Sequence, residues 1–507
     1  MTKKTSLDKD LKRIVQLERA TATVGKNNIN LAISILFLIG VVIFAAFQNN
    51  GSENNTLLIV AAVIGGYMSL NIGANDVANN VGPAVGSKAI TLFGALIIAA
   101  IFESAGAIIA GGDVVTTISK DIIDPKIIAD KEIFIWAMMS ALLAAAVWVN
   151  VATYIGAPVS TTHAVVGGVL GAGVAAAGVT AVNWPVMLKI AASWVISPVL
   201  GGVIAACFLA FAKYFILYKE NKLAAAQRWV PVLVGILASA FSVYLVMKGL
   251  KKVWQPDTAI IAMIAAGAFL IVYATVRPVV INAAANMPNK RKSVSDLFTI
   301  PLICAAALLS FAHGANDVAN AVGPLAAIAS AINIGTIAAK VTLPIWILII
   351  GAVGISIGLL LFGPKVIEIV GEKITKLNRV RAFCIALSAA ITVIIASTLG
   401  LPVSSTHIAV GAVFGVGFLR ELLANRNTSI SKENPHEITS SAIVNGQIRE
   451  PESETSSKII YNKAVMKNQK RKLIRRSHLI TIVAAWVITV PAAAILSGLI
   501  FFILQKL

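Results

Sequence analysis

The motif GANDVAN occurs twice in this chain, at residues 73–79 and 314–320, each time within an apolar stretch. Each copy supplies an aspartate carboxylate and two asparagine carbonyls, oxygen ligands that suit a hard cation such as Na⁺; the carboxylate alone could carry H⁺. A buried acid in an apolar segment is a functional candidate by default, and an Asp/Asn pair serving only to join helices would be a costly alternative. The predicted cation site draws on Asn75, Asp76, Asn79, Asn316, Asp317 and Asn320.

Glycines accompany both copies of this motif. Gly73 and Gly314 open them, and the pairs Gly82-Pro83 and Gly323-Pro324 follow them. Because glycine relaxes the backbone and proline removes a helical hydrogen bond, we expect the helix to unwind here. Unwinding would free backbone carbonyls as further cation ligands.

A second motif is also duplicated, as PVSTTH at residues 158–163 and PVSSTH at 402–407. Its proline favours a first helical turn, its hydroxyl residues cap helix starts, and a Gly/Ala/Val run follows. Free N–H groups and the positive dipole end of such a helix start attract anions, to which hydroxyls also donate. Hydroxyls that bond back to their own helix are the alternative, but two copies in register favour an anion site. Its candidate ligands are Ser160, Thr161, Thr162, Ser404, Ser405 and Thr406.

Two further ionisable residues stand alone. Glu103 lies in the middle of an apolar run, where an acid is a functional candidate. His313 precedes the second GANDVAN, whereas the first has Ile72 at this position, and this asymmetry favours a tuning or proton role. His163 and His407 end the PVS motifs, and either contact with the anion or local bonding would explain them.

Composition identifies an all-α polytopic membrane protein. Of the 507 residues, 58% are hydrophobic and 13% are charged, and the mean hydropathy is +0.85. A soluble domain carries about a quarter charged residues. Apolar runs of membrane-spanning length recur along the chain, which predicts about 11–13 membrane segments. The net charge of +19 does not indicate a nucleic-acid partner, because the basic residues cluster in loops between the apolar runs.

These loops predict the orientation of the chain through the positive-inside rule. The leader 1–26 has seven basic and three acidic residues, and segment 421–477 is also strongly basic, so both are expected in the cytoplasm. Loop 111–132 has more acidic than basic residues and is expected outside. The loop that contains Lys248, Lys251 and Lys252 contradicts the rule, whereas the other loops agree with it.

The two motifs recur in the same order, with offsets of 241 and 244 residues, which indicates a gene-duplication repeat. By the orientation above, the first GANDVAN lies in an inward-running span and the second in an outward-running one. Such inverted topology is typical of secondary transporters, which bind substrate at the repeat interface. The predicted parts are a leader with an extra span (1–56), transport repeat 1 (57–217), connecting spans (218–296) and transport repeat 2 (297–507), with a polar cytoplasmic loop at 421–477.

A transporter is favoured over an enzyme. An intramembrane hydrolase built from Ser, His and Asp needs one nucleophile beside one base, whereas here the Ser/Thr–His element is duplicated and lacks a nucleophile elbow. We therefore expect no catalytic residue and no cofactor. Phosphate and sulfate are both tetrahedral, so a sulfate transporter of the same fold is the alternative; only phosphate can carry a proton for a carboxylate to accept.

The duplicated GANDVAN and PVS[TS]TH motifs resemble the signatures of the inorganic phosphate transporter (PiT) family, over about 57–217 and 297–507. The resemblance implies cation-coupled import of inorganic phosphate, with Na⁺ or H⁺, by alternating access. It further implies two re-entrant helical hairpins, a homodimer in the lipid bilayer, and a plasma-membrane location such as the bacterial inner membrane.

The resemblance also assigns roles to residues. It places Na⁺ ligands at Asn75, Asp76, Asn316 and Asp317, and phosphate contacts at the two Ser/Thr clusters. Glu103 and His313 match functionally important family positions. Animal members of the family carry a second intramembrane glutamate where this chain has Ala386. The resemblance therefore does not decide the coupling mode of this chain, which could use Na⁺, H⁺ or a metal–phosphate complex. It does not decide the stoichiometry either.

Overall fold

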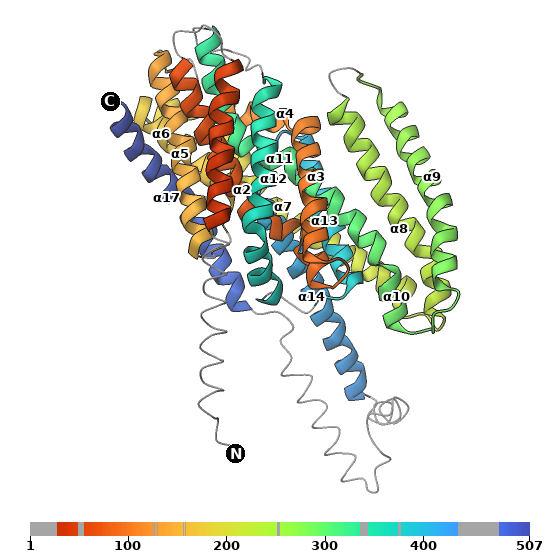
Figure 1. The fold of residues 1–507 in the computed structure, drawn as a ribbon. Helices are drawn as coiled ribbons and strands as arrows, with labels where there is room; N and C mark the ends of the chain where they lie inside the picture. The colour runs from red at the N-terminus through yellow and green to blue at the C-terminus, as the bar shows by residue number, and fades with distance from the viewer. Residues whose placement is uncertain are drawn as a thin grey trace, which may run out of the picture.

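In the computed structural model the chain forms a bundle of α-helices (Figure 1). Twelve of the described helices are long and apolar enough to cross a membrane, which confirms the all-α polytopic class and the predicted number of segments. Among the described residues, β-structure is limited to one isolated bridge. The structure describes residues 28–48, 55–124, 127–128, 130–155, 157, 159–250, 254–334, 343–373, 377–433 and 476–506.

The first half of the bundle follows the helix Asn28–Gln48, the extra N-terminal span. This helix lies against the bundle, because the Asn30 side chain donates to the Leu361 carbonyl (2.8 Å). The helices of the first half are α2 (Asn55–Gly86), α3 (Leu92–Ala110), α4 (Gly112–Thr116), η1 (Thr117–Asp121), α5 (Lys131–Ile155), α6 (Thr161–Ala177), η2 (Val179–Ala181) and α7 (Trp184–Ala212), which continues as η3 (Lys213–Leu217).

Two long helices connect the halves and stand as an arm at one side of the bundle in Figure 1. They are α8 (Lys222–Tyr244), which continues as η4 (Leu245–Gly249), and α9 (Thr258–Ala284), and the short α10 (Arg291–Leu297) follows them. The apolar side chains of α9 remain largely exposed, as expected for a helix that faces lipid.

The second half repeats the order of the first. Its helices are α11 (Thr299–Ile334), α12 (Ile345–Lys373), α13 (Arg379–Thr398), α14 (Ser405–Glu433) and α17 (Arg476–Leu504). Helix α14 thus runs into the segment 421–477 expected to be a loop, and residues 434–475 of that segment lie outside the described residues.

The equivalent helices α2 and α11 run in opposite directions. Gly65, early in α2, lies against Leu325, late in α11. Further along α2, Asp76 lies 3.9 Å from His313, which is earlier in α11. The two halves are therefore inverted relative to each other.

The expected unwinding at the GANDVAN glycines does not occur, since both motifs lie inside unbroken helices. These glycines instead allow close helix contact. A side chain at Gly73 would overlap the Ile355 carbonyl of α12, and one at Gly314 would overlap the Glu103 carbonyl of α3. The prediction was wrong because tertiary contact, and not backbone freedom, explains glycine here.

The helix after each PVS motif packs against a helix of the other half. Gly167 and Gly171 of α6 pack against the backbone of α17, and Gly411 and Gly415 of α14 pack against the backbone of α7. Each PVS helix is thus held by a helix from the other half. The small residues after these motifs therefore serve close helix packing.

Candidate ion and anion site

Two helix starts meet in the centre of the bundle. Helix α6 begins at Thr161 and α14 begins at Ser405, where the PVS motifs predict helix starts. Ser160 is the N-cap of α6, and its Oγ accepts from the backbone N–H three residues on (3.1 Å). Ser404 makes the same bond for α14 (3.2 Å). These two predicted phosphate ligands therefore act as helix caps in this structure.

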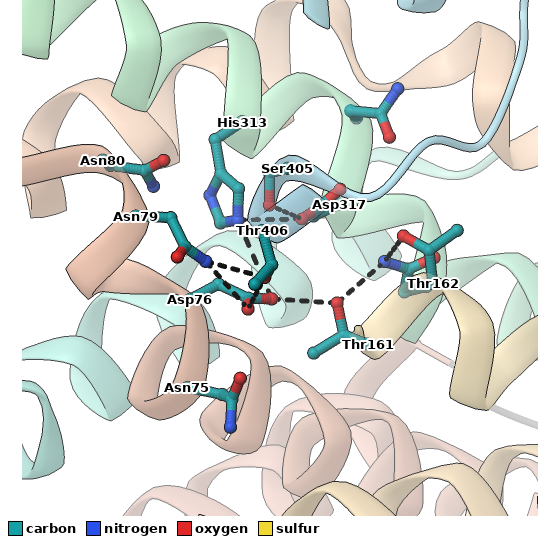
Figure 2. A network of polar contacts seen from close by, with 12 residues as sticks. Asn75, Asp76, Asn79, Asn80, Thr161, Thr162, His313, Asp317, Ser405 and Thr406 are labelled. Carbon is teal, nitrogen blue, oxygen red and sulfur yellow. Dashed lines mark hydrogen bonds and ion pairs between the residues drawn. The ribbon is translucent and has the colours of Figure 1, made fainter. Parts of the chain in front are cut away.

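The tips of the hairpins α5–α6 and α13–α14 touch each other. Thr162, in the first turn of α6, donates its hydroxyl hydrogen to the carbonyl of Val403, just before α14 (3.0 Å). Figure 2 shows hydroxyls from both helix starts converging on the carboxylates of α2 and α11. Residues more than 240 positions apart in the sequence thus form one polar centre.

Asp76 of α2 accepts hydrogen bonds from both hairpins. Thr161 of α6 donates to its Oδ2 (2.9 Å), and Thr406 of α14 donates to its Oδ1 (3.2 Å). Asn79, one turn further along α2, donates to the same Oδ1 (3.4 Å). The carboxylate therefore holds the two hairpin starts together.

Asp317 of α11 lies beside Asp76 and accepts a hydrogen bond from a hydroxyl at the start of α14. Ser405 donates to its Oδ2 (3.0 Å), and His313 Nε2 lies 2.8 Å from the same oxygen and 3.9 Å from Asp76 Oδ2. The side chains of Asp76, Asp317 and His313 are at most 1% exposed. Ligand atoms of these three side chains lie within 4.8 Å of one another, close enough to hold one metal ion.

Glu103 joins the same network from α3. Its Oε2 lies 3.3 Å from His313 Nδ1, and its Oε1 accepts from the Asn80 side chain of α2 (2.7 Å). Both Glu103 and His313 are fully buried. His313 therefore bridges Glu103 on one side and the two aspartates on the other.

Asn79 and Asn320 reach across to the opposite hairpin in equivalent ways. Asn79, in the first half, donates to Thr406 Oγ1 of the second half (2.8 Å). Asn320, in the second half, donates to Thr161 and Thr162 of the first half (3.3 and 3.1 Å). The predicted supporting asparagines thus position hydroxyl groups of the predicted anion site.

Asn75 and Asn316 lie next to the hairpin connections. The Asn75 amide, oriented so that both of its polar atoms are satisfied, donates to the Val159 carbonyl and to Asp76 Oδ1 (3.2 Å each). Asn316 donates to the Leu401 carbonyl (3.3 Å). Both side chains bind the backbone just before a PVS helix, and Asn75 also contacts the carboxylate of Asp76. Their assignment as Na⁺ ligands stays a prediction.

His163 and His407 face each other behind the helix starts. Their ring centroids are 4.4 Å apart in an edge-to-face arrangement, and the His163 ring lies 3.8 Å from the ring of Trp194. Trp194 of α7 also donates to the Pro402 carbonyl (3.1 Å). The structure therefore favours local packing for these two histidines.

Sequence reasoning missed several partners of the site. Asn80 directly follows the first GANDVAN, and its extra amide was the available signal. Trp194 lies in AASWVISP, which recurs in similar form as VAAWVITVP at residues 483–491, and this third repeated segment was the available signal. Ser397 of α13, which accepts from Asn316 (2.9 Å), offered no signal beyond a hydroxyl near the end of an apolar helix.

Comparison with known proteins identifies the family of this chain. The model of the phosphate transporter family matches residues 72–497. A Helicobacter pylori (strain ATCC 700392 / 26695) protein named "Putative phosphate permease" is 46% identical, with 97% of this chain and 98% of the relative aligned. A Pyrococcus horikoshii protein, also named "Putative phosphate permease", is 34% identical. The alignment covers 88% of this chain and 97% of that relative.

A solved structure described as "The sodium-dependent phosphate transporter" superimposes with a TM-score of 0.74 at 34% identity. The match covers 89% of this chain and 100% of that one. Because the family model and these relatives match most of its length, this chain belongs to the phosphate transporter family.

Proposed function

We propose that this protein is a cation-coupled importer of inorganic phosphate that works by alternating access. As a family member it transports phosphate and is not an enzyme, and the twelve long apolar helices among its described residues fit a multi-pass protein of the bacterial inner membrane. The proposal adds the coupling cation, the direction of transport and the residues that bind.

One observation carries the proposal: the hydroxyl donors of both hairpin starts are bound to the two central aspartates. Thr161 and Thr406 donate to Asp76, and Ser405 donates to Asp317. A phosphate ion would need the same hydrogens. Phosphate and the carboxylates therefore compete for one set of donors.

A cation at Asp76 and Asp317 resolves this competition. It binds the carboxylate oxygens, weakens their hydrogen bonds to the hydroxyls, and offsets the repulsion between two carboxylates and an incoming phosphate. The released hydroxyls and the helix starts then bind the anion. Cation binding thereby strengthens phosphate binding, which is the thermodynamic basis of coupling.

The charge of the centre also supports a coupling cation. Three carboxyl groups, from Asp76, Glu103 and Asp317, surround the single imidazole of His313. With all three carboxyl groups ionised, even a protonated His313 leaves negative charge in a buried site, which is costly inside a membrane protein. Na⁺ or H⁺ would neutralise it. The solved relative is described as sodium-dependent, which supports Na⁺.

Alternating access would follow from movement of the hairpins. We propose that α5–α6 and α13–α14 are re-entrant and approach the centre from opposite membrane faces. In a homodimer, one part of each subunit could stay fixed while the other rocks around the bound ions.

Phosphate uptake into proteoliposomes tests the proposal. We expect Asp76→Asn and Asp317→Asn to lower the initial rate to background, because each removes a cation-binding charge. Asp257→Asn is the matched control: Asp257 caps α9, away from the site, and asparagine caps equally well. Wild-type rates of uptake in both site variants would contradict the proposal.

Ion replacement in the same assay identifies the coupling cation. Loss of uptake when choline replaces Na⁺ at fixed pH means Na⁺ coupling, whereas retained uptake with a pH dependence means H⁺ coupling. Competition by arsenate but not by sulfate is expected for a phosphate site. The reverse order of competition would identify the sulfate alternative.

A further inference from the structure

A polar cavity lies among α7, α10, α13 and α14, away from the proposed transport site. Its volume is about 290 Å³. Besides apolar residues it is lined by Tyr218, Asn378 and four basic residues. The basic residues are Lys213, Arg291, Arg381 and Arg420.

The four basic residues concentrate positive charge in a partly enclosed space. Lys213 lies close enough to Arg420, Arg381 and Arg291 to be repelled by all three. Lys213, Arg381 and Arg420 are partly buried, so water screens this repulsion only in part.

Basic residues outnumber acidic residues at this cavity. No acidic side chain is among the described residues that line the cavity. Asp296 of α10 forms its ion pair with Arg379, outside the cavity. Even if Glu421, next to Arg420 in α14, balances one of the four cations, an excess of positive charge remains.

The cavity lies far from the aspartates. Arg420 is 15 residues after Ser405 on α14, which corresponds to about 22 Å along the helix. It lies where α14 approaches the basic segment 421–477, on the face that the charge distribution assigns to the cytoplasm. Figure 1 shows α10 and α14 at the same end of the bundle.

We propose that this cavity binds a phosphate-bearing anion, separately from the transported phosphate. Arginine forms paired hydrogen bonds to phosphate oxygens, and lysine adds a point charge. The source is the headgroup of an anionic lipid or a soluble phosphate compound; basic pockets between helices at the cytoplasmic face suit lipid headgroups. The bound anion would join α7 and α10 to the base of the α13–α14 hairpin.

Thermal unfolding of the full-length protein tests this site. The protein is purified in neutral detergent, stripped of lipid, and titrated with phosphatidylglycerol, with cardiolipin, or with soluble tripolyphosphate; phosphatidylcholine is the uncharged control. We expect the unfolding midpoint to rise saturably with an anionic ligand and not with phosphatidylcholine. A response only to the lipids identifies a headgroup site, and a response to tripolyphosphate identifies a soluble ligand.

The double variant Lys213→Gln/Arg420→Gln should lose about tenfold or more in apparent affinity, because it removes two charged hydrogen-bond donors. The matched control, Lys219→Gln/Lys292→Gln, removes two exposed charges nearby and should bind as the wild type does. Any binding at the transport site contributes equally to both variants. If the double variant does not fold, the single Lys213→Gln variant is compared instead. An unresponsive wild type, or equal affinities in wild type and site variant, would overturn the proposal.

Discussion

Glu103 and His313 are the two ionisable site residues without an ionisable counterpart in the other half, and they contact each other at 3.3 Å. Much of the centre follows the repeat: each aspartate accepts from a hydroxyl of its own half, and Asn79 and Asn320 each reach into the other half. One asymmetric ionisable pair, with Asn80 bound to Glu103, is therefore inserted into a largely symmetric site. Through His313, this pair can bias the charge shared by the two aspartates.

At the residue scale, the competition for hydroxyl groups predicts that one substitution lowers the affinity for phosphate and raises the affinity for Na⁺. Thr406→Val keeps the side-chain shape but removes a donor that Asp76 now binds. We expect phosphate affinity to fall about tenfold, the cost of losing a hydrogen bond to a charged group. Apparent Na⁺ affinity should rise, because Asp76 loses a competing partner.

Uptake measured against phosphate and Na⁺ concentration separates the two effects. Thr275→Val is the control, since Thr275 is exposed on α9 and donates only to carbonyls of its own helix. A fall in both affinities for Thr406→Val would contradict the competition and indicate a general disturbance of the site.

At the scale of helices, the site depends on contacts too close for a side chain. Gly106 of α3 and Gly314 of α11 each face backbone of the other helix, and this approach brings Glu103 to His313. Another helix contact accounts for Lys248, one of the three lysines in the loop that contradicts the positive-inside rule; Lys251 and Lys252 lie outside the described residues. Lys248 forms an ion pair with Asp113 and donates to the Thr398 carbonyl (3.0 Å). A lysine neutralised in this way does not report on orientation.

Substituting one of these glycines tests the close approach. Gly314→Ala places a methyl group against the Glu103 carbonyl, and such overpacking costs about 1–3 kcal/mol. The thermal unfolding midpoint of the purified protein should fall. Gly82→Ala, in the same motif region of α2 but with open space around it, should gain about 0.5–1 kcal/mol from better helix propensity. Equal effects of the two substitutions would argue against the contact.

At the scale of the whole molecule, inversion places equivalent helix ends on opposite membrane faces. Helix α2 ends near Gly86 and its equivalent α11 ends near Asn333, and both residues are exposed. The charge distribution assigns the first end to the cytoplasm and the second to the outside. The proposed homodimer would leave this arrangement intact, since inversion is internal to one chain.

Cysteine labelling in whole cells checks this arrangement. The three native cysteines, Cys207, Cys304 and Cys384, are first replaced by alanine. A membrane-impermeant maleimide should then label Asn333→Cys in intact cells, but Gly86→Cys only after permeabilisation. Thr258→Cys and Lys219→Cys serve as outside and inside controls. Labelling of both test positions from the same face would refute the inversion.

Much of the fold was predictable because its signals are local. The apolar runs specify helices of membrane-spanning length. The Ser/Thr residues after Pro158 and Pro402 predict the starts of α6 and α14, because capping depends only on residues within one turn. Three repeated segments in the same order predict two related halves. The wrong expectation, unwinding at Gly73 and Gly314, arose because a glycine in a sequence does not reveal whether backbone freedom or a close neighbour requires it.

The sequence by itself therefore determined which residue types could bind a cation and an anion, and that each set occurs twice. Only the tertiary structure decided that the two sets form one centre, with Thr161 and Thr406 on Asp76 and Ser405 on Asp317. It also decided that each PVS helix packs on a helix of the other half. The physical reason is range: caps and hydropathy act within a few residues, whereas these contacts join residues up to 330 positions apart and depend on how whole helices pack.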